Sequence, residues 1–110
     1  MVDIQNLSKL YYTIGEVAKM FDVSTSLLRY WESEFTQISP GKNNKGDRRY
    51  TKKDIQKIKR IYVLLKEEGF TIDGAKSAYK IREEKDAKVE SIISDLKKIK
   101  KNMTKLRNHL

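Results

Sequence analysis

The sequence predicts a mainly α-helical chain in which a helix-turn-helix and a short hairpin precede a C-terminal coiled-coil helix. Three observations indicate this arrangement. Two short helical patterns are separated by a tight turn, a loop rich in turn-forming residues follows them, and a heptad repeat of apolar residues occupies the end of the chain. We therefore expect two parts, residues 1–84 and residues 85–110.

Two short helices are predicted near the start of the chain. Thr13 and Glu16 match a capping box, and the apolar residues that follow keep helical spacing as far as Asp22. Ser24 caps a second helix directly afterwards, so the two helices meet across a tight turn, as in a helix-turn-helix. At 100° per residue the second helix has two faces. The apolar face holds Leu27, Leu28, Trp31 and Phe35, the opposite face holds Thr25, Ser26, Arg29 and Ser33, and Tyr30 lies on the flank.

A loop and two further helices complete the first part. Residues 36–50 contain the only proline and two of the five glycines, which favours a loop or a short hairpin with NNKG at its tip. Thr51 caps a third helix that ends at Gly69, and Thr71 caps a fourth. Whether the fourth helix bends or stops near residue 84 stays open. The apolar residues of the third helix are Ile55, Ile58, Ile61, Tyr62 and Leu65.

A narrow apolar seam marks the last part of the chain. Its residues are spaced 3, 4, 3, 4, 3 and 4 apart, which is a heptad repeat. A helix that packs on its own domain would show a broader stripe, so we interpret the seam as the dimerisation surface of a coiled coil of undecided orientation. The seam consists of Val89, Ile92, Leu96, Ile99, Met103, Leu106 and Leu110.

Basic charge is concentrated in two segments of the chain. The net charge is +9, and residues 42–60 carry nine basic and two acidic side chains, while residues 85–110 carry eight and three. Such a balance suits a polyanionic partner, either nucleic acid or an anionic membrane surface. The sequence has no export signal and no run of 18 apolar residues. We expect a cytoplasmic, nucleoid-associated protein with no membrane partner.

Residues suited to catalysis or metal binding are scarce. The chain has no cysteine, and its single histidine, His109, stands next to the C-terminal residue. The sequence shows no nucleophile with a base, no paired carboxylates suited to a cleft and no phosphate-binding glycine loop. We therefore expect no enzymatic activity, no metal and no cofactor.

Three stretches of the sequence resemble the DNA-binding domain of the MerR family of bacterial transcription regulators. YTIGEVAKMFDVSTSLLRYWE is similar to the family's helix-turn-helix, KGDRRYTKKD to its wing, and LLKEEGFTIDGA to its second wing, which together cover residues 12 to about 80. The resemblance implies a winged helix-turn-helix, followed by a long helix that pairs antiparallel in a homodimer. It also implies sequence-specific binding of double-stranded DNA, with bending and untwisting of a promoter so that its elements realign for RNA polymerase.

Other interpretations and departures from the family remain. An architectural or excisionase-like DNA-binding accessory protein would not act on RNA polymerase, and a coiled-coil protein with a basic tail would bind RNA or membrane instead.

Trp31 stands where the family often has a second Tyr, and Asp47 where the wing often has Tyr. Because sensing members carry cysteines or an effector domain after the dimer helix, the chain resembles a minimal DNA-binding and dimerising unit, or a piece of something longer.

The second helix of the helix-turn-helix, which we expect to be the recognition helix, supplies the first DNA-contact candidates. We expect Arg29 to lay its guanidinium on a phosphate or on guanine, unless it pairs with Glu32 or Ser33 on the same helix. Tyr30 either packs partly on the core or, as the resemblance implies, touches the DNA backbone through its hydroxyl. Thr25 and Ser26 either donate to phosphates and base edges or serve only as caps.

The wing supplies further candidates, because its cations can reach a minor groove or the flanking phosphates. We expect Tyr50 to be mostly structural, and at least one of Arg48 and Arg49 to touch DNA. Lys66 matches a family position near the backbone, with a salt bridge as the alternative. The full set of DNA-contact candidates is Thr13, Ser24, Thr25, Ser26, Arg29, Tyr30, Lys42, Lys45, Arg48, Arg49, Tyr50 and Lys66.

Overall fold

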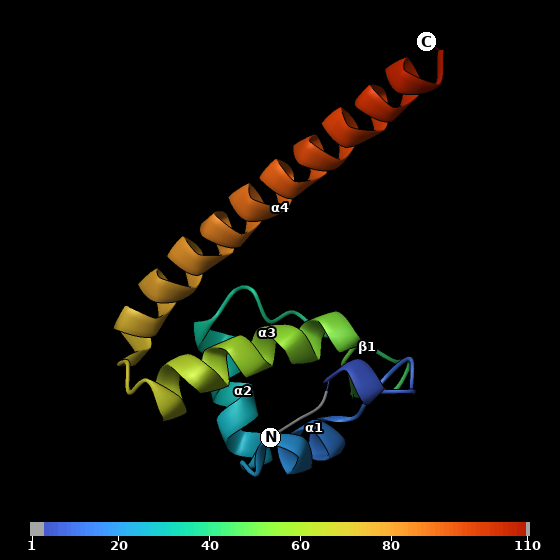
Figure 1. Ribbon diagram of the computed structural model, residues 1–110. Coiled ribbons are helices and arrows are strands. Elements are labelled where there is room, and N and C mark those ends of the chain that lie inside the picture. The colour runs from blue at the N-terminus through green and yellow to red at the C-terminus, as the bar shows by residue number, and fades with distance from the viewer. Residues whose placement is uncertain (1–3, 110) are drawn as a thin grey trace. The chain divides into compact units, whose positions relative to one another are not determined.

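The computed structural model of the chain describes residues 4–109, with side chains described for all of these except Gln5 and residues 104–109. The chain divides into two units, Met1–Lys76 and Ser77–Leu110. Figure 1 shows the elements, which follow in chain order: a 3₁₀ turn η1 (Ile4–Asn6), helices α1 (Ile14–Phe21) and α2 (Thr25–Glu34), strands β1 (Gly41–Lys42) and β2 (Arg48–Arg49), helix α3 (Lys52–Tyr62), a π-helical segment η2 (Val63–Glu67) and helix α4 (Ile72–His109).

The turn between α1 and α2 has the short connection that a helix-turn-helix requires. Thr13 and Glu16 form the predicted capping box at the start of α1. Asp22 ends α1 in the left-handed conformation, with φ of 53°, a region that Asp tolerates better than most residues. Ser24 then caps α2 by accepting a 3.0 Å hydrogen bond from the backbone N of Leu27. The predicted pair of helices and both of their caps are confirmed.

One face of α2 anchors this helix in the core of the first unit. Leu28, Trp31 and Phe35 are buried, and the Trp31 ring meets the Tyr62 ring edge-on, with centroids 6.5 Å apart. Leu27, which the pattern places on the same face, is only partly buried. Helix α1 contacts both α2 and α3. The largest fully buried side chains are Val17, Leu28, Trp31, Phe35, Tyr50, Ile55, Ile58, Ile61 and Leu64.

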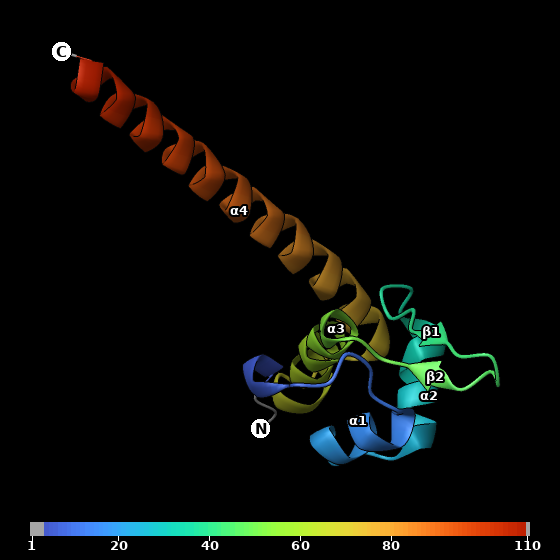
Figure 2. The same ribbon diagram turned by 90° about the vertical axis from the view of Figure 1, so that its right-hand side faces the viewer.

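The predicted hairpin forms as a short antiparallel wing, the β1–β2 hairpin of residues 41–49. Gly41 pairs with Arg49, and Lys42 pairs with Arg48. The Oδ1 atom of Asn43 closes the turn by accepting hydrogen bonds of 2.9 Å from the backbone N atoms of Lys45 and Asp47. Figure 2 shows the two paired strands of the wing. The chain is thus a mainly α-helical winged helix-turn-helix, as predicted.

Helix α3 passes into a π-helical segment that the sequence pattern does not indicate. The i to i−5 hydrogen bond from the N of Glu68 to the O of Val63, 2.9 Å long, belongs to this wider turn. Gly69 follows with a positive φ of 72°, at the predicted end of the helix. Leu64 is fully buried, whereas the predicted Leu65 is only partly buried. The helical pattern places Leu65 on the apolar face, but the residue that belongs to the core is Leu64.

Helix α4 answers the question that the sequence left open near residue 84. It begins after Thr71, whose hydroxyl accepts a 3.1 Å hydrogen bond from the N of Gly74, and continues without a break to His109. Every side chain from residue 83 to residue 103 is exposed. The functional division at residues 84 and 85 stays a prediction. No helix within residues 4–109 is both long and apolar enough to cross a membrane.

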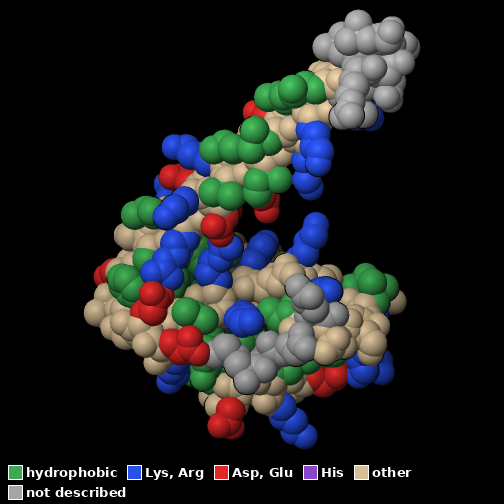
Figure 3. All heavy atoms as spheres, in the orientation of Figure 1, with side chains coloured by type: hydrophobic (Ala, Val, Ile, Leu, Met, Phe, Trp, Pro, Cys, Tyr) green, Lys and Arg blue, Asp and Glu red, His purple; other side chains and the backbone are tan. Residues whose placement is uncertain are grey.

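The predicted seam of α4 is exposed along its described length. The seam residues Val89, Ile92, Leu96, Ile99 and Met103 are between 47% and 64% exposed. Figure 3 shows hydrophobic side chains following one another along this helix. The side chain of Leu106 and the whole of Leu110, which complete the predicted seam, lie outside the described residues.

Candidate nucleic-acid interface

The exposed face of α2 carries the candidates that the helix pattern singled out. Arg29 is exposed, and Tyr30 is 47% exposed, while their neighbours Leu28 and Trp31 are buried. Within the part of the chain that the structure describes, the Arg29 side chain makes no hydrogen bond or ion pair. The alternative pairing with Glu32 or Ser33 is therefore absent, and the five N–H donors of Arg29 remain free for a partner.

Two acidic residues at the end of α2 are instead paired with distant cations. The Nε atom of Arg48, on β2, donates a 2.6 Å hydrogen bond to Oε2 of Glu32. The Nζ atom of Lys76 donates a 2.9 Å hydrogen bond to Oε2 of Glu34. The pKa values of Arg48 and Lys76 are raised, chiefly by these hydrogen bonds. Glu32 thus fastens the wing to α2.

The four threonine and serine candidates near the helix starts differ in exposure. Thr13 and Ser24 are exposed, and their hydroxyl oxygens accept the capping hydrogen bonds of α1 and α2. Ser26 is exposed, whereas Thr25 is partly buried. A capping hydroxyl accepts through its oxygen and keeps its own O–H donor. The caps therefore do not prevent Thr13 and Ser24 from donating to a phosphate.

Tyr50 has the structural character expected of it. It is 1% exposed, and its backbone N and O atoms exchange 2.8 Å hydrogen bonds with those of Tyr12. Its hydroxyl is buried and has no hydrogen-bond partner within the described residues. Burial, followed by the charge of Glu32, raises the pKa of Tyr50 to about 12. The backbone of Tyr50 thus joins the end of the wing to the segment before α1, while its side chain lies in the core.

An open cleft of about 410 Å³ lies between the wing, α2 and the segment that precedes α1. Four of the predicted candidates line it, namely Thr13, Arg29, Arg48 and Arg49. Lys42, Lys45 and Lys66 are exposed but do not line the cleft. The lining contains three arginines and one acidic residue, Asp47, and this excess of positive charge suits a phosphodiester backbone.

Tyr11 and Asn43 are two of the lining residues that the sequence reasoning did not include among the DNA-contact candidates. Tyr11 lines the cleft, and the guanidinium carbon of Arg49 lies 5.2 Å from the centroid of its ring. Asn43 also lines the cleft and holds the turn of the wing. The sequence contains a signal for Asn43, because Asn commonly closes turns through its side chain. Nothing local points to Tyr11, since its partner lies 38 residues along the chain.

Comparison with known proteins identifies the group to which this fold and interface belong. The model of the family described as "MerR HTH family regulatory protein" matches residues 12–80. The chain belongs to this MerR family. The match spans both helices of the helix-turn-helix, the wing, and the start of α4.

Individual relatives of the MerR-family chain agree with this assignment. The HTH-type transcriptional regulator ZntR of Escherichia coli K12 is 26% identical over 110 residues, covering 86% of this chain and 77% of ZntR. A MerR family regulator from Bacillus thuringiensis is 26% identical, with a TM-score of 0.51, over 91% of this chain and 99% of that one.

A second solved structure shares the fold of the MerR-family chain. HiNmlR is described as a MerR family regulator that lacks the sensor domain, and its structure is bound to promoter DNA. It is 24% identical to this chain, with a TM-score of 0.54 over 80% of each chain. This MerR-family chain is accordingly a DNA-binding transcription regulator with a winged helix-turn-helix fold.

Proposed function

We propose that the protein is a homodimer that binds a specific double-stranded DNA sequence and distorts promoter DNA for RNA polymerase. The observation that carries this proposal is the exposed apolar seam of α4. Large apolar side chains that are about half exposed along one helical stripe need a partner surface, and a second copy offers an identical seam. Ile93, which is 45% exposed and adjoins the seam, widens that surface.

The DNA-contact face is built on the other unit of the chain. Helix α2 presents Arg29 and Tyr30 to solvent, while Trp31 anchors the helix in the core. The wing is fastened to the same helix through Glu32 and presents Arg49. A helix held in this way can enter a major groove while the wing contacts the flanking phosphates.

Dimerisation gives the recognition helix its register on DNA. Two copies of α2 contact two half-sites, and the paired helices determine the spacing between these half-sites. Bending or untwisting the DNA between them costs several kcal/mol, which one protomer alone cannot offset. The resemblance to the MerR family supports promoter distortion, and the complex of HiNmlR with promoter DNA supports a promoter as the target.

Selection of genomic fragments by the purified protein tests this proposal. We expect the bound fragments to share two symmetric half-sites with a constant spacer, located between promoter elements. Bound fragments confined to recombination attachment sites would instead favour an architectural accessory protein. Analytical ultracentrifugation of the same preparation tests the dimer separately, and a monomer at micromolar concentration would contradict that part of the proposal.

A further inference from the structure

An exposed aromatic ring lies against one of the wing arginines. The guanidinium carbon of Arg49 is 5.2 Å from the centroid of the Tyr11 ring, which is within the range of a cation–π interaction. Tyr11 is 46% exposed, and Arg49 is exposed as well. The pair therefore sits at the surface, where a partner can reach the free edge of the guanidinium.

The backbone explains why these two residues meet. Tyr12 and Tyr50 form an antiparallel bridge, with hydrogen bonds of 2.8 Å in both directions, and both of their side chains are buried. Because successive side chains in extended backbone point to opposite sides, the adjacent Tyr11 and Arg49 face solvent together. Diagonal neighbours across such a bridge are within reach of aromatic and long side chains.

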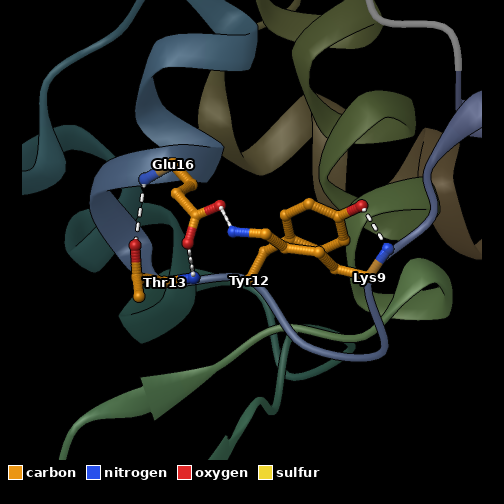
Figure 4. Close-up of polar contacts among 4 residues, drawn as sticks. All are labelled: Lys9, Tyr12, Thr13 and Glu16. Atoms are coloured by element: carbon orange, nitrogen blue, oxygen red, sulfur yellow. Dashed lines mark hydrogen bonds and ion pairs between the residues drawn. The ribbon is translucent and has the colours of Figure 1, made fainter.

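The segment that carries Tyr11 is held on both sides. Figure 4 shows Lys9, whose Nζ donates a 2.8 Å hydrogen bond to Oε2 of Glu16 and whose backbone N donates one of 2.9 Å to the hydroxyl of Tyr12. On the other side, Thr13 and Glu16 form the capping box of α1. The hydrogen bond between Lys9 and Glu16 raises the pKa of Lys9 and lowers that of Glu16. The backbone on both sides of Tyr11 is thus hydrogen-bonded within the chain itself.

The pair opens onto the cleft that also receives Arg29 and Arg48. The Nε atom of Arg48 is engaged by Glu32, so Arg49 is the wing arginine whose donors no carboxylate occupies within the described residues. An aromatic ring attracts the guanidinium through its face and leaves the N–H groups at the rim unoccupied. Those donors can therefore form hydrogen bonds with an anionic oxygen while the ring contact persists.

We propose that Tyr11 is a positioning residue for DNA binding, whose ring holds the Arg49 guanidinium at the mouth of the cleft for a backbone phosphate. The inference rests on the proposed binding of DNA by the wing and adds the residue that orders it. A long side chain loses rotamer freedom when it binds, and ordering it beforehand reduces that cost. The ring face supplies this effect, and the Tyr11 hydroxyl does not.

The inference is tested by measuring how tightly wild type and Tyr11 variants bind one duplex. This duplex is the one that the wild-type protein selects from a random pool. Tyr11→Leu keeps apolar bulk without a π face, and we expect it to weaken binding by about two- to tenfold, the cost of ordering one long side chain. Tyr11→Phe, which keeps the ring face, should bind the duplex with wild-type affinity. Leu10→Ala, a truncation at the adjacent and 75% exposed position, is the matched control and should leave the affinity unchanged.

Combining Tyr11→Leu with Arg49→Ala distinguishes a positioning role of Tyr11 from a general structural role. We expect Tyr11→Leu to have no further effect once Arg49 is truncated, because the ring then has no cation to place. Equal losses in the wild-type and Arg49→Ala proteins would overturn the inference. A Tyr11→Phe protein that lost as much affinity as Tyr11→Leu would overturn it too, since the hydroxyl would then be the DNA contact.

Salt dependence and NMR distinguish failure of this inference from failure of DNA binding. Arg49→Ala should reduce the slope of log K against log salt by about 0.9, whereas Tyr11→Leu should lower the affinity at constant slope. In the free protein, Tyr11→Leu should abolish the ring-current shift of the Arg49 side-chain protons. A wild-type protein without salt-dependent duplex binding would refute the proposed function, and an absent ring-current shift would refute the pair alone.

Discussion

The Nε atom of Arg48 donates a 2.6 Å hydrogen bond to Oε2 of Glu32, which joins the wing to the recognition helix across 16 residues of sequence. Both side chains are about a quarter exposed. The two adjacent wing arginines therefore have different surroundings. Arg48 is held by a carboxylate of α2, while Arg49 lies over the Tyr11 ring and keeps its donors accessible.

Because of these different surroundings, truncating Arg48 and truncating Arg49 should have different effects on DNA binding and on stability. We expect Arg49→Ala to weaken DNA binding more than Arg48→Ala and to reduce the salt slope by about 0.9, the contribution of one phosphate contact. Arg48→Ala should lower the free energy of unfolding by less than about 1 kcal/mol, because its ion pair is partly solvated. Titrations at several salt concentrations and urea unfolding measure both effects. A larger slope change in Arg48→Ala would reverse the assignment.

Arg29 is the candidate for direct reading of DNA. Its side chain has no partner among the described residues and faces away from the buried side of α2. We expect Arg29→Ala to weaken binding to the selected duplex by about 1–3 kcal/mol with unchanged circular dichroism. Lys57→Ala removes an exposed cation outside the candidate set and serves as the control. Equal affinities of wild type and Arg29→Ala in a gel-shift titration would eliminate this role.

Tyr50→Phe should stabilise the protein. The buried hydroxyl lacks a partner among the described residues, and removing an unpaired buried polar group while keeping the ring relieves a cost of about 1 kcal/mol or more. The pKa raised to about 12 means that the folded state retains the proton when an unfolded tyrosine has lost it. Wild-type stability should therefore fall as the pH rises from 10.0, the ordinary pKa of tyrosine, to about 12.

Urea unfolding at neutral pH and at about pH 11 tests both parts of this prediction. The advantage of Tyr50→Phe over wild type should grow at the higher pH, because phenylalanine does not ionise. A destabilised Tyr50→Phe protein would show that the hydroxyl makes a favourable contact instead.

Leu96 lies in the seam of α4 and is 60% exposed within one chain. We expect Leu96→Ala to weaken the dimer by about 2 kcal/mol or more for each protomer, the usual cost of truncating a buried leucine, while the helical content stays unchanged. Ser94→Ala lies outside the seam on the same helix and provides the control. Sedimentation equilibrium measures the two dissociation constants. If both variants dimerise like wild type, the seam is not the interface.

The sequence predicts most of the local structure correctly. The caps at Thr13, Ser24, Thr51 and Thr71 all form, because each depends on a hydrogen bond to the backbone three residues further along the helix. The turn of the wing follows from Asn43 and Gly46 in the same way. The heptad spacing is equally visible in the sequence, and the structure shows its described side chains exposed.

Two further features of the helices were not settled by the sequence pattern. Burial of Leu64 in place of Leu65 depends on a π turn, which the period of an ordinary helix does not anticipate. The open question at residue 84 arose because no Gly or Pro stands there, and the structure continues the helix.

The sequence by itself determined where the helices begin, their caps, the wing turn and the heptad spacing of the seam, since all of these depend on neighbours along the chain. Only the tertiary structure decided that Glu32 holds Arg48, that the Tyr50 hydroxyl is buried without a partner among the described residues, and that Tyr11 meets Arg49. These contacts depend on how the wing packs against α2 and the segment before α1. Similar residues could pair in many ways along an unfolded chain, and packing selects one of these arrangements.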